Sequence, residues 1–162
     1  MMNKIGQEAS DFMLPTDEGK FLSLKTLRGK KVILYFYPKD NTPGCTKEAC
    51  AFRDSWSNLE KINTTVVGIS RDSVGAHQIF KEKYNLPFTL LSDKGSNVCE
   101  QYDVLVDKSL FGKKYQGVER TTFLIDEKGI ILAIWRKVKV DGHVVELLKE
   151  LSSVNQSQLE EI

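Results

Sequence analysis

A continuous apolar run at residues 32–37 constrains the fold more than any other feature of this sequence. Its six residues, VILYFY, are β-branched, aliphatic or aromatic, and no charged residue interrupts them. A half-buried strand would alternate apolar and polar residues, whereas a strand covered on both faces reads as an unbroken apolar run. The run ends at Pro38, which cannot donate to a strand ladder. We therefore expect a central strand in a sheet whose two faces are both covered.

Helices and strands are predicted to alternate after this run. Residues 45–59 carry apolar side chains at three- and four-residue spacing, which predicts a helix with one core-facing stripe. Further strands are expected at residues 65–69, 88–91, 120–125 and 130–136. Further helices are expected at residues 73–84, 96–102 and 141–151.

This order predicts an α/β fold with a central mixed β-sheet flanked by helices. No repeat or linker divides the sequence, so a single domain is expected over residues 1–162. A polar loop is expected through Lys113 and Lys114, and the polar tail from about residue 153 is expected to be frayed.

Composition excludes several classes of protein. Hydrophobic residues make up 41% and charged residues 28% of the chain, which is too apolar and too balanced for a disordered protein. The 23 basic and 22 acidic residues give a net charge of +1, so nucleic acid is not an expected partner. No apolar run approaches the roughly 18 residues that span a bilayer, and the first residues lack the apolar core of a secretory signal. We expect a cytoplasmic protein with no membrane partner.

The three cysteines, Cys45, Cys50 and Cys99, are too few and odd in number for a disulfide framework. In a reducing compartment such thiols serve packing, metal binding or redox chemistry. Cys45 and Cys50 lack the second ligand pair of a structural zinc site, and their spacing is not the Cys-x-x-Cys of thioredoxin-type oxidoreductases. His77 and His143 have no cysteine or acid at metal-ligand spacing, so both are interpreted as surface or capping residues. No metal or other cofactor is expected.

Cys45 lies in the first turn of its predicted helix, just after Pro43 and Gly44. Free backbone amides and the helix dipole favour an anion there, and the thiolate is the reactive form of cysteine. By position alone Cys45 could equally be a small buried hydrophobe. Thr42 could turn its hydroxyl toward the sulfur or toward a ligand, or act as an ordinary cap. Pro38 could shield the sulfur from water, or simply end the strand.

Together these residues form the run YPKDNTPGCTKEAC at residues 37–50, which resembles the active site of peroxiredoxins. Its Pro-x-x-x-Thr-x-x-Cys core, with a second cysteine five residues later, is similar to the peroxiredoxin Q branch, also called bacterioferritin comigratory protein. The similarity continues through FTLLSD at residues 88–93 and RTTFLID at residues 120–126, and it extends over nearly the full chain.

The resemblance implies a thioredoxin-like fold and the reduction of hydrogen peroxide and organic hydroperoxides without metal, haem or flavin. It implies that Cys45 is the peroxidatic cysteine, that Thr42 orients the peroxide and that Pro38 screens the sulfur. Arg120 would supply the positive charge that holds Cys45 as thiolate. Cys50 would resolve the sulfenic acid as an intrachain Cys45–Cys50 disulfide, which thioredoxin or a similar dithiol protein would reduce. The resemblance also implies a monomer.

The remaining residues leave alternatives open. Glu48, one turn after Cys45, could orient Arg120 through a bidentate pair, or could be an acid favoured by the helix dipole. Cys99 lies on a short predicted helix without polar catalytic neighbours and is interpreted as a buried bystander. Two rival functions are a disulfide-exchange oxidoreductase and a redox-sensing or chaperone-like binding protein that is triggered by oxidation of Cys45.

Overall fold

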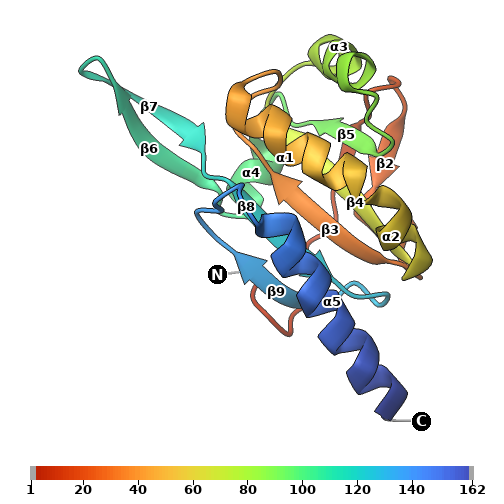
Figure 1. The fold of residues 1–162 in the computed structure, drawn as a ribbon. Coiled ribbons are helices and arrows are strands. Elements are labelled where there is room, and N and C mark those ends of the chain that lie inside the picture. The colour runs from red at the N-terminus through yellow and green to blue at the C-terminus, as the bar shows by residue number, and fades with distance from the viewer. Residues whose placement is uncertain (1–2, 161–162) are drawn as a thin grey trace.

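The computed structural model describes residues 3–160, with side chains described as far as residue 154. A five-stranded mixed sheet with the order β5-β4-β3-β8-β9 forms its centre (Figure 1). The strands are β3 (Lys31–Phe36), β4 (Thr64–Ser70), β5 (Thr89–Ser92), β8 (Thr121–Ile125) and β9 (Ile131–Trp135). β3, β4 and β5 are parallel, and β8 runs antiparallel to both β3 and β9. The predicted central strand is confirmed, because all six residues of β3 are buried.

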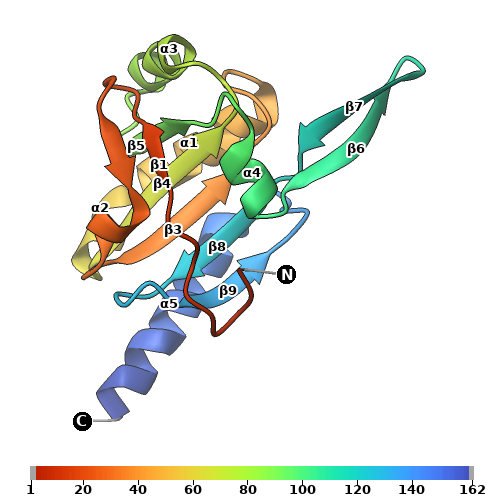
Figure 2. The same ribbon diagram turned by 180° about the vertical axis from the view of Figure 1, so that it is seen from behind.

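Helices cover one face of this sheet, and a mixture of short elements covers the other (Figures 1 and 2). The helices on the first face are α1 (Pro43–Asp54), α2 (Trp56–Lys61), α3 (Val74–Tyr84) and α5 (His143–Glu160). The short elements on the second face are β1 (Met13–Pro15), β2 (Phe21–Ser23), a 3-10 turn (Leu24–Leu27) and α4 (Asn97–Gln101).

Side chains of β3 alternate between two hydrophobic cores, as the pleat of a strand requires. On the helical face, Ile33 and Tyr35 pack with residues of α1 such as Cys45 and Phe52. On the opposite face, β3 packs with residues of the N-terminal segment and α4, Cys99 among them. Cys45 and Cys99 therefore belong to different cores on opposite sides of the sheet.

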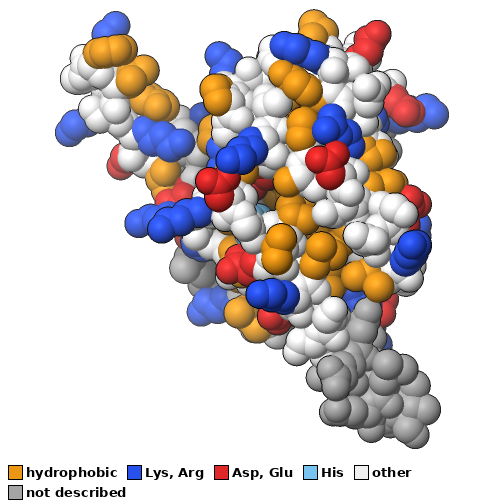
Figure 3. Space-filling model, viewed as in Figure 1, with side chains coloured by type: hydrophobic (Ala, Val, Ile, Leu, Met, Phe, Trp, Pro, Cys, Tyr) orange, Lys and Arg blue, Asp and Glu red, His pale blue; other side chains and the backbone are white. Residues whose placement is uncertain are grey.

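The segment predicted as a polar loop instead forms a hairpin of β6 (Leu105–Leu110) and β7 (Lys113–Val118). Its turn residues Phe111 and Gly112 have φ angles of 50° and 77°, in the left-handed region that a two-residue hairpin turn requires. The hairpin projects from the body, so most of its side chains are exposed and no alternation of burial marked it in the sequence. Figure 3 shows apolar side chains at the hairpin's tip beside lysine or arginine side chains, and Phe111 is 97% exposed.

Two helix boundaries also differ from the prediction. The helix predicted at residues 45–59 divides at Ser55 into α1 and α2. The final helix, predicted to end at Leu151, continues to Glu160 because no glycine or proline follows Gly142. The tail expected to be frayed from about residue 153 is therefore helical through Glu160, and residues 161–162 lie outside the described part. None of the described helices combines the length and the apolar character needed to cross a membrane.

Candidate active site

Cys45 is the third residue of α1, at the end of the sheet where β3 finishes. Thr42 precedes the helix in an extended conformation, and Pro43 occupies the first helical position, where its missing N–H costs nothing. The Cys45 side chain is 2% exposed and packs in the core beneath α1. The thiol thus lies at a helix N-terminus, where backbone amides favour an anion, and is shielded from bulk water.

Arg120 reaches this sulfur from a distant part of the chain. β8 pairs antiparallel with β3, with Thr121 opposite Phe36, so Arg120 lies where β3 ends. Its Nη2 is 3.4 Å from Cys45 Sγ. Gly44 makes room for the guanidinium, because a Cβ at that position would lie 3.2 Å from Nη2. The structure therefore brings together the arginine and the cysteine that were predicted to share the site.

Glu48 holds the other side of the same guanidinium. Arg120 Nη1 donates to Glu48 Oε1 at 2.8 Å, and the Glu48 side chain is 1% exposed. Of the two alternatives left open for Glu48, the pair with Arg120 is present, but through one hydrogen bond rather than two, because the second amino group of Arg120 faces the sulfur. Among the described residues, the buried Glu48 Oε2 has no hydrogen-bond partner. Burial raises the pKa of Glu48 to about 7, although the charge of Arg120 acts in the opposite direction.

Thr42 and Pro38 both precede Cys45 along the chain. The Thr42 hydroxyl donates to the Lys39 carbonyl at 2.8 Å, rather than turning toward Cys45 as one alternative expected. Its hydrogen is therefore in use, while its oxygen lone pairs can accept a hydrogen bond from a ligand. Pro38 is half-buried, two residues after the end of β3.

The other two thiols have different surroundings. Cys50 is half-buried on α1, five residues after Cys45. Cys99 is fully buried on α4, beneath the opposite face of the sheet. Its backbone N–H donates to Asp93 Oδ2 at 2.7 Å, and burial followed by the nearby Asp93 raises the pKa of its thiol well above the ordinary range. Cys99 therefore has the inert setting that was expected of a bystander.

The burial of two histidines was not predicted, nor was the lack of a hydrogen-bond partner for the Tyr35 hydroxyl among the described residues. Both were interpreted as surface or capping residues, and the surface part is wrong, because His77 and His143 are 0% and 3% exposed. His77 lies three residues before Phe80 on the apolar face of α3, a spacing that could have indicated its burial. The buried Tyr35 hydroxyl has no hydrogen-bond partner. Burial, and then the acidic groups of Glu48 and Cys45, raise the pKa of Tyr35 well above its ordinary value.

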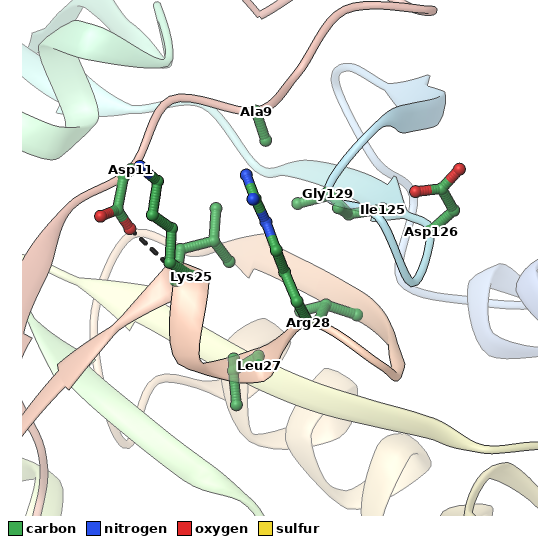
Figure 4. Close-up of a pocket in the computed structure, with 10 residues that line it drawn as sticks. Ala9, Asp11, Lys25, Leu27, Arg28, Ile125, Asp126 and Gly129 are labelled. Carbon is green, nitrogen blue, oxygen red and sulfur yellow. Dashed lines mark hydrogen bonds between the residues drawn. The ribbon is translucent and has the colours of Figure 1, made fainter.

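A small hollow lies at the end of the sheet away from Cys45, between the N-terminal segment and the turn after β8 (Figure 4). Its lining includes Val32 and Ile125, which pair with each other at the end of β3 opposite Cys45. Its volume of about 10 Å³ is roughly that of a single water probe. This hollow is too small for an organic hydroperoxide.

The fold and the Cys45 site define a class of protein that uses an activated thiol. A family model described as the AhpC/TSA family matches residues 5–134, and the chain belongs to this family. The chain is 70% identical over 151 residues to the putative peroxiredoxin bcp of Coxiella burnetii, covering 93% of this chain and 100% of that protein. It is 48% identical over 156 residues to peroxiredoxin Bcp of Bacillus subtilis, covering 96% and 99% respectively.

Solved structures share the fold. A cysteine mutant of PrxQ from Xylella fastidiosa matches with a TM-score of 0.89 at 36% identity, covering 94% of this chain and 97% of that one. The bacterioferritin comigratory protein of Xanthomonas campestris matches with a TM-score of 0.83 at 37% identity, covering 88% and 90%. The thioredoxin-like fold and the resemblance to peroxiredoxin Q are thereby confirmed. The protein is a thiol-dependent peroxidase.

Proposed function

We propose that Cys45 is the peroxidatic cysteine and that its site reduces hydrogen peroxide and organic hydroperoxides. The observation that carries this assignment is the 3.4 Å contact between Arg120 Nη2 and Cys45 Sγ at the start of α1. Helix amides and a guanidinium both stabilise a thiolate, which is the nucleophile that the reaction needs. The Xanthomonas campestris relative is described in terms of alkyl peroxide reduction, which supports organic hydroperoxides as substrates.

In the first step the Cys45 thiolate attacks the terminal oxygen of the hydroperoxide, so that an S–O bond forms and the O–O bond breaks. Cys45 is oxidised to a sulfenic acid, and the leaving oxygen takes up a proton to become an alcohol or water. Arg120 stabilises the negative charge that moves from sulfur to the leaving oxygen. Thr42, with its hydroxyl hydrogen held by Lys39, accepts the peroxide's own hydrogen and so orients the substrate. Pro38 screens the sulfur, and Glu48 positions Arg120.

In the second step the Cys50 thiol attacks the sulfenic acid, which releases water and forms an intrachain Cys45–Cys50 disulfide. Thioredoxin or a similar dithiol protein then reduces this disulfide and becomes oxidised in turn. Cys50 lies on the same helix and is half-buried, whereas Cys99 belongs to the core across the sheet. The proposal also includes a cytoplasmic monomer that needs no metal, nucleic acid or membrane partner.

The test is peroxide consumption coupled to thioredoxin, thioredoxin reductase and NADPH, measured for wild type, Cys45→Ser, Cys50→Ser and Cys99→Ser. We expect Cys45→Ser to abolish peroxide consumption and Cys50→Ser to stop after about one equivalent, because its sulfenic acid has no partner thiol. Cys99→Ser should turn over like wild type. Undiminished turnover by Cys45→Ser would overturn the assignment. A wild type that stops after one equivalent would favour the redox-sensor alternative.

A further inference from the structure

Asp40 is a buried residue of the loop between β3 and α1, and its hydrogen bonds tie that loop to neighbouring elements. Its Oδ1 accepts a hydrogen bond from the Tyr37 hydroxyl at 2.5 Å, and its Oδ2 lies 2.6 Å from His77 Nδ1 on α3. Its backbone N–H donates to Asp72 Oδ2, beyond the end of β4, at 2.8 Å. The Asp40 carboxyl is thus bonded to Tyr37, the residue that follows β3, and to α3, while its backbone is bonded to the segment after β4.

The contacts at the two ring nitrogens of His77 bear on whether the ring carries one hydrogen or two. Nε2 lies 3.0 Å from the Leu91 carbonyl oxygen, which can only accept, so Nε2 carries a hydrogen. Nδ1 faces the Asp40 carboxyl, whose other oxygen already accepts from Tyr37. Both ring nitrogens thus face acceptor groups, an arrangement that favours the imidazolium form of His77. Burial opposes this charge, but the hydrogen bond and negative charge of Asp40 outweigh burial and raise the pKa of His77 above its ordinary value.

The acidic side chains around His77 favour this cation. One ligand atom each of Asp40, Asp72 and His77 lies within 4.8 Å of the others, so a neutral ring would leave two carboxylates together. On α3 itself, Lys81 lies one turn further and pairs with Asp17 at 3.0 Å, which leaves it committed elsewhere. The 2.6 Å contact between His77 and Asp40 leaves no space for a metal ion between the two side chains.

The geometry points to His77 as a positioning residue for the peroxidatic loop, acting through Asp40. Asp40 lies between Lys39, whose carbonyl accepts the Thr42 hydroxyl, and the start of α1. A shift of Asp40 therefore displaces the Lys39 carbonyl, the Thr42 hydroxyl and the helix start that presents Cys45. His77 touches neither the sulfur nor Arg120 among its hydrogen bonds, so it acts on the reaction only through the loop. This inference rests on the proposed role of Cys45.

Because the contact between His77 and Asp40 depends on the charge of His77, the position of the loop depends on pH. The folded protein holds the proton of His77 more tightly than an unfolded chain does, so the loop contact is complete at low pH. The contact is lost as the pH rises through the raised pKa of His77. The groups that face His77 are Tyr37 just after β3, Asp40 from the loop and Asp72 from the segment after β4, together with the Leu91 carbonyl of β5. Burial raises the pKa of Tyr37 well above its ordinary value, so Tyr37 stays protonated across this change.

The experiment measures the rate of the first step by stopped-flow tryptophan fluorescence with hydrogen peroxide, in a Cys50→Ser background, from pH 5.5 to pH 9.5. We expect His77→Gln to slow the step by about tenfold or more, because small misplacements of reacting groups have effects of this size. Asp40→Asn should slow it similarly, and the double variant should be no slower than the slower single variant, since the two residues act as one unit. Lys81→Gln, which removes a different paired cation from the same helix, should remain within about twofold of wild type.

The pH profile separates positioning from a loss of stability. In the Cys50→Ser parent, the rate of the first step should fall at alkaline pH as His77 loses its proton. This alkaline fall should be absent when His77→Gln is added. Nitrogen chemical shifts of His77 in the reduced protein give a readout independent of activity, and they should show both ring nitrogens protonated at pH 7. If His77→Gln does not fold, Asp40→Asn carries the same expectation.

A neutral His77 at pH 7, or a His77→Gln rate equal to that of the parent, would overturn the inference. If Cys45→Ser consumes peroxide as wild type does, the proposed role of Cys45 fails instead, and the two failures are distinguishable.

Discussion

Arg120 Nη2 lies 3.4 Å from Cys45 Sγ, although 75 residues separate the two in the sequence. The contact follows from the antiparallel pairing of β3 and β8, which returns the chain to the sheet end where α1 starts. Glu48 fixes the guanidinium from the other side at 2.8 Å. One planar group thus serves two partners at once, the sulfur and the carboxylate.

Replacing Arg120 tests that double contact. Arg120→Ala should slow the reaction of Cys45 with peroxide by about two to three orders of magnitude, the range seen when a transition-state hydrogen-bond donor is removed. Arg120→Lys should recover only part of the rate, because an ammonium group keeps the charge but loses the planar fork. Single-turnover stopped-flow measurements give the rates, and Arg28→Ala, at the far end of the sheet, is the control. An alanine variant as fast as wild type would remove Arg120 from the site.

The raised pKa of Glu48 predicts that the free energy of unfolding depends on pH. Burial raises its pKa from 4.5 to about 7, so between these pH values the native state keeps a proton that the unfolded state has released. Stability therefore falls as the pH rises through this window, by about 3 kcal/mol at most. Glu48→Gln cannot ionise and should lack this fall. Urea unfolding of the reduced proteins at pH 5 and pH 8 measures the difference, with the exposed Glu60→Gln as control. Parallel stability curves for wild type and Glu48→Gln would contradict the prediction.

Cys99 should be dispensable for turnover. It is fully buried in the core across the sheet from Cys45, and its burial disfavours the thiolate. Cys99→Ser should keep thioredoxin-linked turnover within about twofold of wild type, although the buried hydroxyl lowers stability by about 1–3 kcal/mol. Mass spectrometry of the peroxide-treated wild type should find Cys45 linked to Cys50. A Cys45–Cys99 bond as the main product would show that the resolving thiol is wrongly assigned.

Disulfide formation should unwind the start of α1. The helix runs without a break from Pro43 to Asp54 and includes both Cys45 and Cys50. Five residues of regular helix separate two Cα atoms by roughly 8.6 Å, whereas a disulfide allows no more than about 6.8 Å. The first turns must therefore melt before the bond can close, which also moves the sulfurs toward a protein reductant.

Hydrogen–deuterium exchange of the reduced and oxidised proteins tests this unwinding. We expect the amides of residues 45–50 to lose protection in the disulfide form, while those of β3 and α5 keep theirs. The Cys50→Ser variant, treated with one equivalent of peroxide, is the control because it cannot form the bond. Equal protection of residues 45–50 in the two forms would refute the unwinding.

Patterns that depend on neighbouring residues were predictable from the sequence. The apolar run at residues 32–37 identified β3, because only a strand covered on both faces can be apolar throughout. The apolar spacing identified α1 and its buried stripe, and Pro43 and Gly44 identified its start. The same local run carried the resemblance to peroxiredoxins, which the comparisons confirm.

Features that depend on distant residues were not predictable in this way. The hairpin of β6 and β7 lacks a buried face, so periodicity did not mark it. The hydrogen-bond partners of His77, Asp40 and Leu91, lie on other elements, so its spacing along α3 could indicate its burial but not its partners. The single contact between Glu48 and Arg120 depends on a sulfur competing for the same guanidinium.

The sequence alone therefore determined the central strand, the helix start and the thiol that lies there, because backbone preference and hydrophobic periodicity are local properties. Only the tertiary structure decided which charges meet that thiol. Strand pairing sets the position of Arg120, and the packing of α3 against the sheet sets the position of His77. Electrostatic interactions act through space over a few ångströms, and the order of residues along a chain does not specify which of them lie that close.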